Sequence, residues 1–144
     1  MSNSQQLVVS CAAMAVLVFL VALRLLQNRV VEMRAKRINP QATSNSIQMA
    51  SRLENVQAAD NYKNLFEAPI LFYALCAVAV ATNYTPNWLV FGAWVFVALR
   101  YLHSFIQCTY NKVMHRFPVF LTSLALIVAL WVAFAIGFYN IAVK

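Results

Sequence analysis

The chain has 144 residues, of which 62% are hydrophobic and only 10% are charged, and its formal net charge is +7. A soluble domain is typically about 45–50% apolar and roughly 25% charged, so a soluble fold of this size would leave much apolar surface in water. The composition therefore excludes the ordinary soluble classes and predicts one integral membrane domain over residues 1–144.

Four apolar blocks follow one another along the chain, each near the length of about 17–25 residues that a helix needs to cross a bilayer. They cover residues 6–26, 65–82, 88–108 and 119–142. The turn NYTPN between the second and third blocks is short, which predicts a tight antiparallel hairpin. The connection before the fourth block is also short and ends at Pro118, a residue that suits the first turn of a helix. The predicted fold is all-α, a bundle of four transmembrane helices.

The first connection, residues 27–64, is the only long polar stretch. From Ser46 onward its composition is typical of a helix, so the second helix is predicted to begin well before its apolar block. One face of that helix, about a quarter of its circumference, carries polar side chains. These are Gln57, Asp60, Asn64 and Glu67. Pro69 follows closely and is expected to leave a carbonyl without its usual partner or to mark a kink.

The basic residues lie on one side of the predicted bundle. All Lys and Arg residues except Lys144 lie in or beside the first and third connections, and the NYTPN turn has none. Because positive loops stay in the cytoplasm, both connections are predicted to be cytoplasmic and both termini to lie outside. The net charge therefore indicates orientation and contact with lipid headgroups, and no nucleic-acid partner is expected.

The third block contains two ionisable residues, Arg100 and His103, which lie on one helix face that Gln107 extends by another turn. An ionisable group in hydrocarbon costs at least about 2.5–3.5 kcal/mol, so protein, water or a ligand must receive it. Glu67, on the predicted second helix, is the expected partner of Arg100. This pattern fits either a polar pocket for a ligand or an ionic contact that only joins helices.

The three cysteines, Cys11, Cys76 and Cys108, lie in or at the edge of apolar blocks and have no CxxC spacing. Cysteine in such a position usually packs as a small hydrophobic residue. Neither a metal site nor a disulfide is therefore predicted.

Two motifs carry a family resemblance: N-x-x-E at Asn64–Glu67 and R-x-x-H at Arg100–His103. They lie in the segments NYKNLFEAPILFYAL and ALRYLHSFIQ, and Arg116 follows. With four spans and a long basic first connection, the chain resembles the MAPEG family, the membrane-associated proteins in eicosanoid and glutathione metabolism. It is most similar to bacterial members of unassigned activity. The resemblance implies a homotrimer in a bacterial inner membrane, with glutathione as the cofactor or substrate of its enzymes.

The resemblance also implies a site in a cleft between subunits. Its ligand-binding residues would be Asn64, Glu67, Arg100, His103 and Gln107. Arg116 would be the catalytic residue, because a nearby cation lowers the pKa of a thiol and the thiolate is the nucleophile.

The chain departs from this pattern at four positions. Asp60 and Gln57 stand where glutathione-binding members carry arginines, and Gln107 and Phe120 stand where tyrosines are common. An acidic residue near the carboxylates of glutathione would repel them.

Two functions follow from these observations. The first is a membrane protein that binds a lipophilic small molecule or a membrane partner in a polar cleft, without established catalysis. The alternative is a glutathione-dependent transferase or peroxidase that acts on lipophilic electrophiles. Proton-coupled export is a third class, but small four-helix exporters carry a glutamate deep in their first helix, and here no charge precedes Arg24.

Overall fold

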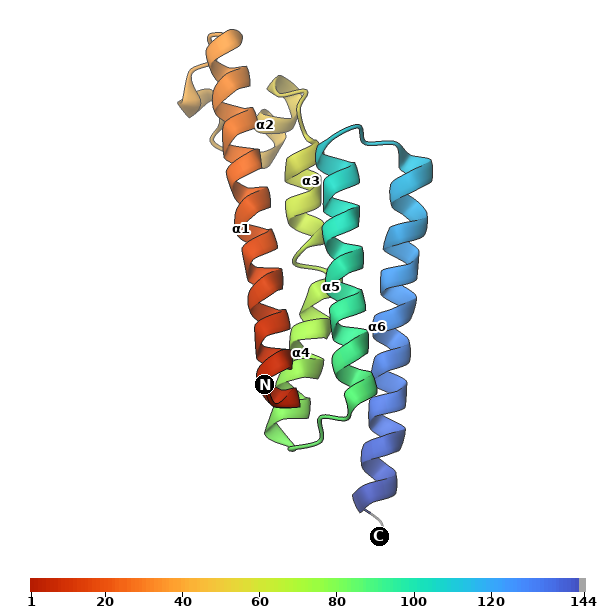
Figure 1. Cartoon of the computed structure of the whole chain (residues 1–144). Helices are drawn as coiled ribbons and strands as arrows, with labels where there is room; N and C mark the ends of the chain where they lie inside the picture. Colours follow the sequence, from red (N-terminus) through yellow and green to blue (C-terminus); the bar gives the residue numbers. More distant parts are fainter. Residues whose placement is uncertain (143–144) are drawn as a thin grey trace.

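The computed structural model describes residues 1–142 and consists of long helices that run side by side (Figure 1). Three of them are α1 (Asn3–Ala35), α5 (Asn87–Cys108) and α6 (Val113–Ala142). The remaining span is built from two shorter helices, α3 (Gln57–Asn64) and α4 (Ala68–Ala81). All four spans are long and apolar enough to cross a membrane, and no strand occurs in residues 1–142. The predicted four-helix membrane fold is confirmed.

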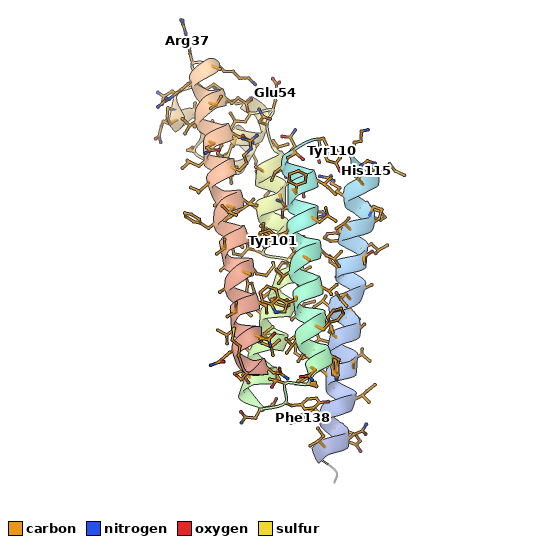
Figure 2. The ribbon with its side chains drawn as sticks, viewed as in Figure 1. Arg37, Glu54, Tyr101, Tyr110, His115 and Phe138 are labelled. Carbon is orange, nitrogen blue, oxygen red and sulfur yellow. The ribbon has the colours of Figure 1, made fainter. Side chains whose placement is uncertain are left out.

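Helix α5 lies at the centre of the packing, with α1 and α3 on one side and α6 on the other. Its inward face contributes Phe96, whose ring stacks on Phe72 of α4 with centroids 4.9 Å apart. The Tyr101 hydroxyl of α5, labelled in Figure 2, donates to the Ala13 carbonyl of α1 at 2.8 Å. Apolar side chains such as Phe91 also point outward, as expected of helices whose solvent is hydrocarbon.

The hairpin between α4 and α5 is as tight as its sequence predicts. Asn83 takes a positive φ of 54°, a conformation that asparagine tolerates better than most residues. The amide of Asn3 donates to the Thr85 carbonyl and to Asn87 Oδ1, both at 2.7 Å. These bonds hold the first turn of α1 against the hairpin (Figure 1).

The second span is interrupted between α3 and α4, at residues 65–67. Pro69 has no N–H to offer the Leu65 carbonyl, and its ring would collide with that carbonyl in a continuous helix. Pro69 therefore ends the helix before it, and the predicted kink is confirmed as a break.

The predicted continuous helix from Ser46 is wrong. The chain instead forms a short 3-10 turn, η1 (Pro40–Thr43), then α2 (Ser46–Arg52), and residues 53–56 are not helical. Glu32 of α1 holds this linker, because its carboxylate accepts the backbone N–H groups of Glu54 at 2.7 Å and Asn55 at 3.0 Å.

Lys36 completes the contact between α1 and the linker. Its ammonium lies 2.7 Å from Glu32 and 2.8 Å from Glu54, and these two carboxylates raise the pKa of Lys36 above its ordinary value. Helix α1 thus extends nine residues beyond its predicted apolar block, or about 14 Å at 1.5 Å per residue. The first connection is packed against this extension.

Candidate functional site

Arg100 is fully buried, although arginine is a long basic side chain that usually reaches solvent. Its guanidinium lies between the rings of Phe96 and Phe120, with the carbon Cζ 5.3 Å and 5.2 Å from their centroids. None of its three nitrogen atoms has a hydrogen-bond partner in the described part of the chain. Aromatic faces attract a cation, but they do not replace hydrogen bonds to its N–H groups.

The expected ion pair between Glu67 and Arg100 is not formed, and that prediction is wrong for the single chain. The two ion pairs within residues 1–142 both belong to Lys36. Glu67 is exposed and lies in the break before α4, with φ −93° and ψ −88°. Its expected position assumed an unbroken second helix, whereas Glu67 lies in the break between α3 and α4.

His103 is the centre of a polar network in the C-terminal half of α5, the half that also contains Arg100. Its Nε2 lies 2.9 Å from Gln107 Oε1, which also accepts from Asn64 Nδ2 of α3 at 3.3 Å. Its Nδ1 lies 3.2 Å from the carbonyl oxygen of Arg116 in α6. The structure thus brings Asn64, His103, Gln107 and the Arg116 backbone together and joins three helices.

This network restricts the proton positions on His103. As assigned, both ring nitrogens face oxygen atoms, and a protonated imidazolium can donate to both. A neutral ring that donates from Nδ1 to the Arg116 carbonyl must accept at Nε2, which requires the amides of Gln107 and Asn64 both to be turned end for end. The site can therefore hold His103 in either charge state through paired amide flips.

The guanidinium of Arg116 is separate from this network. Arg116 lies in the first turn of α6, and its guanidinium donates to Oδ1 of Asn111, just before that helix, at 2.8 Å. The side chain of Arg116 is partly exposed. Arg116 therefore lies where a water-soluble group could meet it, at the end of the bundle that carries the connection between α5 and α6.

Asn61 belongs to the buried polar cluster, and the sequence analysis missed it. Its amide donates to Cys108 Sγ at 3.3 Å, and it accepts from the Ser104 hydroxyl at 3.2 Å. Asn61 lies three residues before Asn64, and Ser104 and Cys108 are four apart on α5, so pairing the two helix faces would have found the contact.

Comparison with known proteins is consistent with these features. The MAPEG family model matches residues 7–136, which is most of the chain. The chain belongs to the MAPEG family. No curated protein and no solved structure matches this chain.

This MAPEG member differs from the glutathione-binding pattern at Asp60, and the structure shows what surrounds that residue. Asp60 lines a cavity of about 150 Å³ formed by α1, α2, the linker at residues 53–56 and α3, together with Arg29 and Lys63. The two basic side chains offset the acidic one, so the surroundings of Asp60 carry positive charge supplied from other positions.

Proposed function

We propose that this integral membrane protein binds a lipophilic ligand with an acidic group, and that Arg100 receives that group without catalysis. The unpaired guanidinium carries the proposal. An isolated buried charge is costly unless it is paired and hydrogen-bonded. A guanidinium presents its N–H groups in a fork that matches a carboxylate or a phosphate.

The surroundings of Arg100 fit an amphiphile. The ring of Phe120 is partly exposed and covers one face of the guanidinium, so an acidic group would enter past this ring. His103 and Gln107 lie three and seven residues after Arg100 on α5, and Asn64 bonds to Gln107. The ligand's other polar atoms would meet these groups. Its apolar chain would lie among the outward-facing side chains.

The proposed site also includes Glu67 and a neighbouring subunit. In a homotrimer, the exposed carboxylate of Glu67 would line the cleft rather than pair within its own chain. Light scattering on the detergent-solubilised protein measures the number of subunits, and a monomer would contradict this part of the proposal.

Binding of oleate and of its methyl ester tests the proposal directly, because the two differ only in the acidic group. We expect the delipidated protein to bind oleate at least about tenfold more tightly than the ester, which is about 1.4 kcal/mol. Arg100→Met should lose this preference, whereas Arg116→Met should keep it. Equal affinities for the acid and the ester in the wild type would reject the proposal.

A second candidate is a glutathione-dependent transferase or peroxidase acting on lipophilic electrophiles. Membership of the MAPEG family, whose members often use glutathione, favours it, as do the basic side chains of Arg29 and Lys63 beside Asp60. Arg116 would stabilise the glutathione thiolate. Arg116→Ala should then abolish conjugation while the protein stays folded, and no binding at millimolar glutathione would exclude this activity.

A further inference from the structure

The structure brings together two cysteines that are far apart in the sequence. Cys11 lies in α1 and Cys76 in α4, and their side chains meet where both line the same cavity. Both are free thiols; Cys76 is buried and Cys11 is partly exposed. Their contact lies in the half of the bundle that contains the N-terminus and the α4–α5 hairpin (Figure 1).

A cavity reaches this pair of thiols. It has a volume of about 360 Å³ and is lined by Cys11 and Cys76 together with Tyr73, Val8 and Val80. Apart from the thiols and the phenol, the side chains around it are apolar, so the cavity suits an apolar molecule from the surrounding lipid.

We propose that Cys11 and Cys76 are a redox-active dithiol, which a membrane-soluble quinone oxidises to a disulfide that links α1 to α4. Two S–H bonds break and one S–S bond forms. The two electrons and two protons pass to the two quinone oxygens and give one quinol. Reactants and products are all neutral, so the reaction leaves no charge in hydrocarbon, where a charge is costly.

Cys108 provides a matched control within the same chain. It is the last residue of α5, at the opposite end of the bundle from the hairpin, and its sulfur accepts from the Asn61 amide. A quinone that oxidises thiols without selectivity would also modify Cys108, whereas the proposed reaction leaves it free.

The experiment uses the full chain in phospholipid nanodiscs, treated with duroquinone and then denatured for thiol counting with a polyethylene-glycol maleimide. Of the three thiols, we expect one to remain, and a reductant should restore the others. Mass spectrometry should show the peptides of Cys11 and Cys76 joined and lighter by two hydrogen atoms. One quinol should form per chain.

Variants and a second oxidant make the result decisive. Cys108→Ser should retain no titratable thiol after quinone, whereas Cys11→Ser and Cys76→Ser should each keep both of their remaining thiols. If all three wild-type thiols stay titratable after quinone, the proposal is wrong, even if copper phenanthroline forms the bond. Disulfides that join only separate chains would also overturn it. The wild-type measurement needs no variant to fold.

Discussion

Arg100 places a positive charge in the interior of the bundle without a hydrogen-bond partner in the described chain. Replacing a buried charged group with an apolar side chain of similar volume is often neutral or stabilising by about 1–4 kcal/mol. We therefore expect Arg100→Met to leave the delipidated protein equally stable or to raise its free energy of unfolding by up to about that amount. Unfolding in increasing dodecyl sulfate measures the change.

Arg116→Met is the matched control. Its guanidinium makes one hydrogen bond, to Asn111, and a hydrogen bond to a charged group contributes about 1.5–3 kcal/mol. Because Arg116 is partly exposed, its loss should cost no more than the lower end of that range. A loss of several kcal/mol in Arg100→Met would show that the guanidinium is paired after all, for example with a carboxylate of a neighbouring subunit.

The candidate site shows which residue positions a sequence can predict. The spacing of Arg100, His103 and Gln107 required one helix face, and all three are buried on α5. The polar residues of the second span were harder to place, because the sequence analysis assigned them to one face of a continuous helix. The break at residues 65–67 releases Glu67, and the buried position three residues before Asn64 belongs to Asn61. Errors in this region therefore come from backbone geometry and not from the choice of residue types.

The contact of Glu32 with residues 53–56 is the element that organises the first connection. Glu32→Gln keeps the shape of the side chain but removes the charge, so it loses the ion pair with Lys36. It also loses one of the two bonds to backbone N–H groups, because an amide NH2 group cannot accept. Hydrogen bonds to a charged group contribute about 1.5–3 kcal/mol, and we expect a loss of local stability of that order. Hydrogen exchange of the Glu54 and Asn55 amides should then become faster.

Glu54→Gln tests whether this effect belongs to Glu32. The Glu54 side chain is 88% exposed, so its pair with Lys36 should contribute little. Equal acceleration of exchange in both variants would mean that Lys36, and not Glu32, holds the linker.

The close approach of α5 and α6 at Gly92 gives a second prediction about an element. A Cβ atom at Gly92 would lie 2.5 Å from Cδ2 of Leu130, which is buried on α6. We expect Gly92→Val to destabilise the protein by about 1–3 kcal/mol, because extra methyl groups force packed side chains to shift. The double variant Gly92→Val/Leu130→Ala should recover part of the loss. No change in the single variant would show that α6 can move freely against α5.

At the scale of the whole molecule, composition and apolar block lengths were sufficient for the fold class, because a bilayer demands nearly fixed helix lengths. The hairpin between α4 and α5 was predictable for the same reason, since so short a chain between two spans leaves few arrangements. The connection before α6 was predicted wrongly, because α6 begins at Val113 and Pro118, which was expected in the first turn, lies inside the helix. The first connection was not, because its structure depends on the contact of Glu32 with a segment more than twenty residues away. Helix propensity alone cannot report such a contact.

The orientation of the bundle is predicted from the distribution of its charge, and this prediction has a direct test. Arg37 and Glu54 lie at one end of the molecule and Phe138 lies at the other (Figure 2). Positive loops remain in the cytoplasm, so the end with Arg37 should be cytoplasmic and the NYTPN turn should be outside. In a variant with its three native cysteines replaced by serine, Thr85→Cys should react with a membrane-impermeant maleimide in intact cells.

Gln41→Cys is the opposite probe, because Gln41 is exposed in η1 at the other end of the bundle. It should react only after the cells are permeabilised. The reverse pattern would place both termini in the cytoplasm, and the polar network around His103 would then open to the outside. Labelling of both positions in intact cells would indicate mixed insertion, in which case the basic residues of the first connection do not set the orientation.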